Sequence, residues 1–279
     1  MYAAMYQGVE GFQVRAGDDG HHRQLVADAA AIMAGRYPAA THRRACYDLV
    51  LKYDGAEVMP FSWRDHRGGA ASGRTTDAAD VAELNRDLLD SDAIVMFVDG
   101  AELVNDPGAA RSAGRLSSHV LRALHSRERY LTPVVIAITK CDLVDLGDAR
   151  VRTMLGGPLR ELTGAIRASR HVQGAVVRVS CGPSPLNVTQ PVLFTLRCGL
   201  LGMGERLATA AGRFSAAAEA AAGRDTLPGR FMARRRRTPD SGSLAVQLRR
   251  NAERAYQDLL VLIPPAERLD RLLRDVETF

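Results

Sequence analysis

The sequence predicts an α/β protein with a three-layer, mostly parallel sheet, followed by a helical C-terminal extension. Between residues 78 and 179, segments with apolar residues at helical spacing alternate with short apolar runs. These runs are continuously apolar, as in strands that are covered on both faces of a parallel sheet. Residues 204–279 are mainly helical in pattern and include a basic linker.

The N-terminal part of the chain begins with local elements. The pattern predicts a short helix over residues 2–6, a loop leading into a strand over 8–15, and a helix over 21–33 that ends before Gly35 and Pro38. Two alternating apolar runs follow, over 46–53 and 57–63, separated by Asp54-Gly55. Because both positions of a tight hairpin turn need positive φ, this dipeptide predicts an antiparallel pair.

Pro60 lies within the second of these runs. Proline has no N–H to donate to a ladder, so we expect a bulge or a locally unpaired position there.

The middle of the chain alternates between helix and strand. Helices are predicted over 78–89, 117–126 and 151–168, and strands over 93–98, 133–138 and 175–179. Because helices join consecutive strands, we expect parallel pairing with right-handed crossovers.

The C-terminal part has an apolar stretch over 191–201, an alanine-rich run over 207–222 and a helical tail over 244–276, interrupted at Pro264-Pro265. Residues 223–243, which contain four consecutive arginines at 234–237, read as a flexible basic linker. We therefore expect a domain over 1–203 and an extension over 204–279. The alanine-rich face fits either core packing or recruitment of a protein partner.

Composition narrows the class of protein. No apolar run approaches the roughly 20 residues that span a bilayer, and the N-terminus lacks the features of a secretory signal, so we expect a soluble, cytoplasmic protein. The four cysteines are scattered without CxxC pairs, which predicts neither a zinc site nor disulfides. The net charge of +5 is modest and aromatic residues make up 5%, which argues against nucleic-acid binding.

The most informative motif is Thr139-Lys140-Cys141-Asp142, directly after an apolar strand. Ligands of open α/β sheets bind beyond the carboxyl ends of the strands. A carboxylate accepts hydrogen bonds only, and guanine offers its N1–H and exocyclic amino group side by side, whereas adenine has no matching donor pair. Asp142 therefore predicts a preference for guanine, with the aliphatic stem of Lys140 along the purine face.

Three further motifs occupy loops. Ser180-Cys181 follows the next buried strand, where backbone N–H groups could reach the guanine O6 atom. Asp65-His66-Arg67-Gly68 has the spacing of a DxxG motif, in which the carboxylate holds Mg²⁺ through a water and the glycine N–H approaches the γ-phosphate. Thr41 precedes the hairpin, where a hydroxyl could coordinate Mg²⁺.

Each motif also has an ordinary structural interpretation. Asp142 could cap the turn that follows it, Ser180 could be a turn residue, the DxxG segment could be a polar turn, and Thr41 could be a solvated loop residue.

The order of these motifs along residues 1–203 resembles the translation-factor-related P-loop GTPases, nearest to bacterial double-GTPase-type domains, and residues 63–69 (WRDHRGG) are especially similar. The resemblance implies GTP or GDP and Mg²⁺ as ligands. It implies nucleotide contacts from Thr139, Lys140, Asp142, Leu143, Ser180, Cys181 and Gly68, and Mg²⁺ contacts from Thr41 and Asp65.

The chain departs from this family in two respects. It contains no GxxxxGK[ST] phosphate-binding loop, which supplies most phosphate contacts, so nucleotide affinity should be low. Residues 1–6 resemble the helix that normally follows that loop, and two explanations stay open: a start site further upstream, or a real loss. Gly69 stands where relatives carry a water-orienting glutamine or histidine, so we expect slow hydrolysis and assign no catalytic base.

The expected function is a guanine-nucleotide-binding, GTPase-like switch protein, which would hydrolyse GTP only with a phosphate-binding loop restored upstream. The alternative is a pseudo-GTPase, an interaction scaffold that binds no nucleotide. A weaker third reading gives the four arginines at 234–237 a role in binding nucleic acid or an anionic membrane, although such a cluster is usually a solvated patch.

Overall fold

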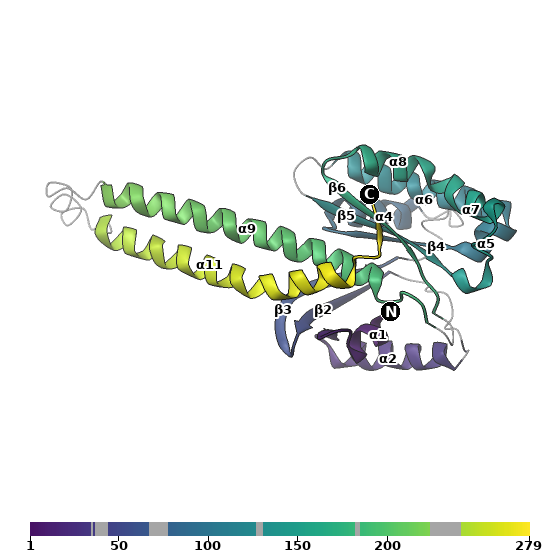
Figure 1. Ribbon diagram of the computed structural model, residues 1–279, viewed down its shortest axis with the longest axis horizontal. Helices are drawn as coiled ribbons and strands as arrows, with labels where there is room; N and C mark the ends of the chain where they lie inside the picture. The colour runs from purple at the N-terminus through teal and green to yellow at the C-terminus, as the bar shows by residue number, and fades with distance from the viewer. Residues whose placement is uncertain (35, 37–43, 67–77, 127–130, 182–184, 224–240) are drawn as a thin grey trace. The chain divides into compact units, whose positions relative to one another are not determined.

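The computed structural model describes the chain except residues 35, 37–43, 67–77, 127–130, 182–184 and 224–240. The described residues form two compact units, one of Met1–Gly199 with Leu269–Phe279 and the other of Leu200–Arg268. The first unit contains helices and two sheets, which confirms the α/β class (Figure 1). The strands are divided between these two sheets and do not form the single, mostly parallel sheet that was expected.

The N-terminal sheet is antiparallel, with strand order β1-β2-β3. Its elements are α1 (Tyr2–Gln7), β1 (Phe12–Ala16), α2 (Asp19–Met33), β2 (Ala45–Tyr53) and β3 (Ala56–Asp65). Asp54 and Gly55 join β2 to β3 with φ values of 47° and 83°, which confirms the predicted hairpin turn. The register shifts between Leu51 and Lys52, close to Pro60 on the partner strand, so the expected irregularity is present.

The C-terminal sheet has the order β4-β5-β6-β7. Its strands are β4 (Ile94–Asp99), β5 (Thr132–Thr139), β6 (Val172–Arg178) and β7 (Glu277–Thr278). The first three are parallel, as predicted, with Ile94 opposite Val134 and Val134 opposite Gly174. The short β7 runs antiparallel to β6, so the last residues of the predicted helical extension pair with the α/β unit.

The helices between these strands are α4 (Ala78–Asp90), α5 (Gly100–Asn105), α6 (Pro107–His125), α7 (Ala149–Gly156) and α8 (Arg160–Ala168). Helix α6 begins ten residues earlier than predicted. Asp106 caps it by accepting a hydrogen bond from Gly108 N at 2.7 Å, and Pro107 occupies its first position. The predicted helix over 151–168 is divided by a 3₁₀ turn (Gly157–Leu159), because glycine and proline at its start disfavour a continuous helix.

β5 is buried on both faces, which explains its uninterrupted apolar sequence. β4 instead alternates buried and more exposed residues, and its Phe97 is exposed. Val134, Ile136 and Ile138 pack in one cluster with residues of α6 and α8. The first part of α9 (Gln190–Gly223) packs against the opposite face of the sheet. There the Cys198 thiol donates a hydrogen bond to Gln173 Oε1 of β6 at 3.3 Å.

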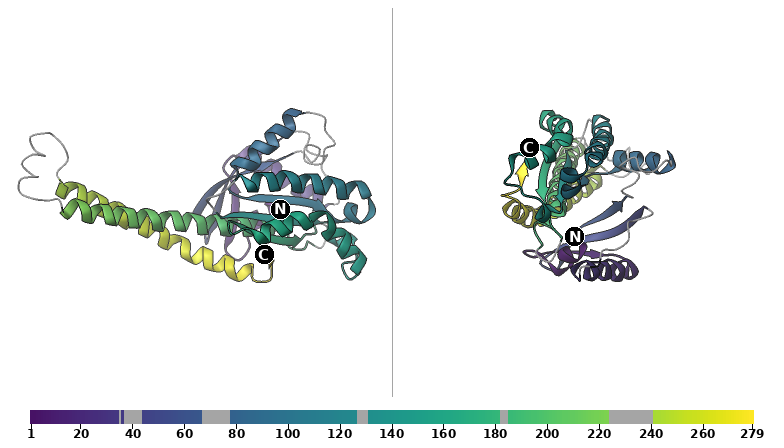
Figure 2. Two further views of the ribbon diagram at one scale, coloured as in Figure 1. Left: turned by 90° about the horizontal axis from the view of Figure 1, so that it is seen from above. Right: turned by 90° about the vertical axis from the view of Figure 1, so that its right-hand side faces the viewer.

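The second unit consists of the remaining part of α9 and most of α11 (Ser241–Leu272), which lie side by side in all views (Figures 1 and 2). A Cβ at Gly204 would lie 3.3 Å from Leu259 Cδ1, so the small residue permits close helix contact. The expected interruption at Pro264-Pro265 is wrong, because α11 continues through both prolines. The prolines leave the carbonyls of Leu260 and Val261 without their usual donors, and both residues are exposed to water.

The interior of the predicted basic linker, including the four arginines at 234–237, lies outside the described residues.

Candidate functional site

The candidate site begins where β5 ends. β5 is buried along its length, and Lys140 then adopts a left-handed conformation with φ 55°. This conformation is uncommon for residues other than glycine, and it turns the chain sharply out of the strand. A 3₁₀ turn, η1 (Cys141–Leu143), follows immediately. The motif found in the sequence is therefore a tight turn at the carboxyl end of the central strand.

The ends of β4 and β5 are joined by an ion pair. Asp99 lies opposite Thr139 in the sheet, and the Lys140 ammonium lies 2.5 Å from Asp99 Oδ2. The other carboxylate oxygen of Asp99 accepts a hydrogen bond from Glu102 N at 3.0 Å, which caps α5. The Thr139 hydroxyl donates to Val98 O at 3.2 Å. Together these contacts hold the Lys140 side chain over the end of β4.

Gly100 permits this close arrangement. A Cβ at this position would lie 2.9 Å from the backbone oxygen of Thr139, so any other residue would push α5 away from β5.

Cys141 and Asp142 differ in exposure although they are adjacent in the turn. Cys141 is buried, donates its N–H to Val179 O at 3.3 Å and its thiol to Ile138 O at 3.0 Å. Burial raises the pKa of this thiol, which fits a structural anchor. Asp142 and Leu143 are exposed, and within the described ranges no group donates a hydrogen bond to the Asp142 carboxylate.

Ser180 and Cys181 lie beside this turn, because the Cys141 N–H bonds to the residue that precedes Ser180. The backbone of Ser180 exchanges two hydrogen bonds with Leu186, at 3.1 and 3.0 Å, so its N–H is already used within the loop. Ser180 as a whole residue is 2% exposed, and its hydroxyl has no hydrogen-bond partner in the part of the chain that the structure describes. Cys181 is exposed. An unpaired buried hydroxyl is costly, which makes Ser180 a candidate for a polar contact.

Of the remaining predicted residues, the structure describes Asp65 alone, and no hydrogen bond or ion pair links it to this turn. Asp65 ends β3 in the other sheet, and it forms no hydrogen bond or ion pair with any described residue. Burial raises the pKa of Asp65, although the charge of His66 opposes this effect. Thr41 and Gly68 lie outside the described residues. The structure therefore brings together the six residues that were predicted to contact the guanine base. They are Thr139, Lys140, Asp142, Leu143, Ser180 and Cys181.

A second polar cluster was not predicted. Asp87 of α4 is buried and accepts hydrogen bonds from Arg44 Nε at 2.5 Å and Arg44 Nη2 at 3.1 Å, and from Arg64 Nη1 at 2.7 Å. His66 Nε2 lies 2.9 Å from Asp87 Oδ2, within ion-pair reach but without hydrogen-bond geometry. Burial raises the pKa of Asp87, but the bonds and charges of Arg44, Arg64 and His66 lower it overall.

This cluster, Asp87 with Arg44, Arg64 and His66, attaches the hairpin of β2 and β3 to α4. One signal in the sequence could have revealed it: Asp87 stands three residues after the buried Leu84, on the apolar side of the helix. A carboxylate at such a position needs charged partners. Asp99 was also missed, although it directly follows an apolar strand and precedes glycine.

The described residues contain neither a cluster of metal ligands nor a helix suited to span a membrane. No three or more histidine, cysteine, aspartate or glutamate side chains come close enough to hold a metal ion. None of the described helices combines the length and the apolar character that crossing a bilayer requires. No family model, no curated protein and no solved structure matches the chain.

Proposed function

We propose that the turns after β5 and β6 form a guanine-binding site and that the protein is a GTPase-like, guanine-nucleotide-binding switch. One observation carries this proposal: the Asp142 carboxylate is exposed at the end of a buried central strand, and no described group donates to it. Both oxygens are therefore available for the paired N–H donors of guanine. Adenine would leave this carboxylate unpaired, and such mismatches are strongly disfavoured in polar sites.

The neighbouring residues support the same role. The ammonium of Lys140 is held by Asp99 at 2.5 Å, which fixes the aliphatic stem as a candidate surface for one face of the purine. Cys141 anchors the turn in the core, so the position of Asp142 depends on rigid elements of the sheet. Cys181, beside the buried Ser180, is the candidate donor of a backbone N–H to the guanine O6 atom.

The described residues offer fewer candidate contacts for the phosphates and Mg²⁺ than for the base. The chain has two lysines, Lys52 and Lys140, and neither belongs to a GxxxxGK[ST] loop. Asp65, Gly68 and Thr41 remain the residues that we propose near the γ-phosphate and Mg²⁺. When bound, Mg²⁺ would neutralise phosphate charge and would favour ionisation of Asp65.

A second candidate is a pseudo-GTPase scaffold that keeps the sheet and binds no nucleotide. The engaged ammonium of Lys140 fits this alternative as well, because its charge is already neutralised by Asp99. The two candidates differ in base recognition, which does not require the phosphate loop.

Selective binding of the base provides the test. Titration with guanosine and GMP, against adenosine and AMP, should show guanine preference in NMR or calorimetry. Asp142→Asn should lower guanine affinity by about tenfold or more, since one acceptor becomes a donor. The same change should improve binding of xanthosine, whose C2 carbonyl can accept from the new amide.

Asp145→Asn is the matched control, because Asp145 lies in the same loop and asparagine can still accept the bond from Gly147 N. Equal binding of guanine and adenine nucleosides, or equal effects of both substitutions, would overturn the guanine site. Absence of any binding would favour the scaffold.

A further inference from the structure

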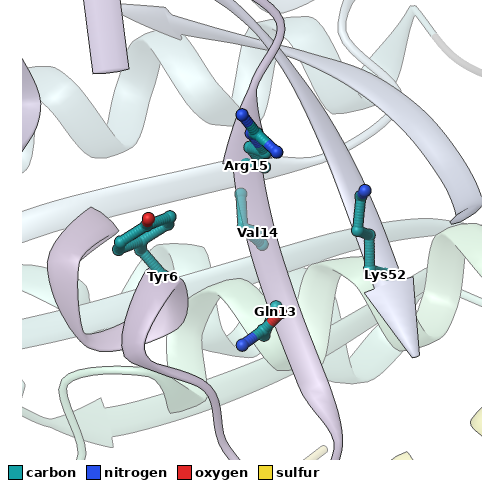
Figure 3. A pocket seen from close by; sticks show the side chains of 5 residues that line it. All are labelled: Tyr6, Gln13, Val14, Arg15 and Lys52. Atoms are coloured by element: carbon teal, nitrogen blue, oxygen red, sulfur yellow. The ribbon is translucent and has the colours of Figure 1, made fainter. Parts of the chain in front are cut away.

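A second candidate site lies on the N-terminal sheet. A shallow pocket of about 320 Å³ is lined by Tyr6, Gln13, Val14, Arg15 and Lys52 (Figure 3). Tyr6 comes from α1, Lys52 from β2, and the other three from β1. The volume lies at the low end of the range for small-molecule sites. All the polar lining side chains carry hydrogen-bond donors, and no lining residue is acidic.

The register of the sheet explains why the two cations share a face. In β1 the residues Phe12, Val14 and Ala16 are buried, so Gln13 and Arg15 point to the opposite face. Lys52 pairs directly with Gln13 across the ladder. It therefore lies on the same face and diagonally beside Arg15, at a separation that one anionic group can bridge.

The positive charge of this pocket is largely uncompensated. Among the described residues, Arg15 has no ion-pair partner. Lys52 lies 3.5 Å from Glu57 Oε1, but the Glu57 side chain is 69% exposed. Exposed pairs of this kind contribute little, so an incoming anion can compete with Glu57.

One wall of the pocket is held in place before any ligand binds. Tyr6 stacks with Tyr2 at 6.1 Å between ring centroids and contacts the His22 ring at 4.5 Å. Tyr2 is fixed in turn, because its hydroxyl accepts from Ala16 N at 3.0 Å and lies 2.9 Å from His22 Nδ1. A prearranged aromatic wall lowers the entropic cost of binding. Tyr6 itself is 41% exposed and so presents ring surface to a ligand.

We propose that this pocket binds a small phosphate monoester, with the phosphate between Arg15 and Lys52 and the organic part against Tyr6. A phosphate monoester carries about −1.5 to −2 charges at neutral pH, which complements the two cations. The Arg15 fork, the Lys52 ammonium and the Gln13 amide supply the donors that its three terminal oxygens accept. The pocket exceeds a bare phosphate in volume, which leaves room for a ring. This proposal does not depend on the guanine site, because the residues are different.

The two lysines allow a direct test. Acylation of the folded protein by a limiting amount of an amine-reactive ester, read by mass spectrometry, reports Lys52 and Lys140 separately. Phenyl phosphate should slow modification of Lys52 and leave Lys140 unchanged. Sulfate at equal ionic strength should protect less, because it has no ring to contact Tyr6. Phosphatidic acid in phosphatidylcholine vesicles tests whether the same group is presented by a lipid.

Variants make the test quantitative. Arg15→Gln should weaken phenyl phosphate binding by about tenfold or more, because a charge-assisted fork is lost, and Tyr6→Leu should weaken it less. Arg111→Gln, on the exposed surface of α6, is the matched control and should have no effect.

Protection of Lys52 by phenyl phosphate, by phosphatidic acid vesicles or by both supports the phosphate site and identifies its source. Equal protection by sulfate, no protection of Lys52, or an equal effect of Arg111→Gln would overturn it. Guanosine should not protect Lys52, so loss of guanine binding and loss of the phosphate site are separate results.

Discussion

Asp87 and Asp142 differ in burial and in the hydrogen bonds that their carboxylates accept. Asp87 is buried on α4, and two arginines donate three hydrogen bonds to its oxygens. Asp142 is exposed on the turn after β5, and within the described part of the chain no group donates to it. The hydrogen-bonding capacity of the Asp87 carboxylate is therefore used within the protein, whereas the Asp142 carboxylate is accessible to a ligand.

The difference separates the structural role of Asp87 from the binding role that we propose for Asp142. A buried charge is stable only with partners, so Asp87 fixes the hairpin of β2 and β3 to α4. An exposed carboxylate adds little to folding, and the neighbouring Cys141 fixes the turn through its hydrogen bond to Ile138 O, which is consistent with the proposed guanine site. Substitution of Asp87 should therefore lower stability, whereas substitution of Asp142 should lower guanine binding and leave stability nearly unchanged.

The largest expected effect is on folding. Asp87→Ala should lower the free energy of unfolding by about 3 kcal/mol, near the lower end for breaking a buried pair, because the arginines are partly exposed. Urea denaturation followed by circular dichroism measures this change. Asp90→Ala at the exposed end of the same helix is the control, with little expected effect. Similar stabilities of the two variants would show that Asp87 is not structural.

A smaller effect on stability is expected at low pH. The partners of Asp87 bring its pKa below the ordinary value of 3.8, despite the opposing effect of burial. The stabilisation from its charge is therefore fully present above pH 3.8 and is lost as pH falls through the folded-state pKa. The difference in urea midpoint between the native protein and Asp87→Asn should be constant near neutral pH and should shrink below pH 3.8. A difference that grows in acid would contradict the network.

The smallest effect on stability is expected at Asp142, in the turn for which we propose guanine binding. Asp142→Ala should change the free energy of unfolding by less than about 0.5 kcal/mol, as for ordinary surface positions. Its effect should appear instead in guanosine binding, measured on the same sample. A large loss of stability would mean that Asp142 has structural partners, and it would remove the contrast with Asp87.

Several features could be predicted from local pattern. The Asp54-Gly55 turn, the parallel strands and the position of Thr139 to Asp142 after a buried strand all follow from residue type and short spacing. The early start of α6 could not be read from apolar periodicity, because Asp106 and Pro107 define it by capping. The continuation of α11 through two prolines also escaped prediction, since it depends on which carbonyls face water.

By itself, the sequence determined the order of helices and strands and placed a carboxylate at the end of a central strand, because periodicity and turn chemistry act over a few residues. Only the tertiary structure decided that the strands divide into two sheets, that Arg44 and Arg64 meet Asp87, and that Arg15 and Lys52 share a pocket with Tyr6. These are contacts between residues far apart in the chain. Strand register and the need to pair buried charges select them. A local pattern can indicate that Asp87 needs partners, but it does not show which residues supply them.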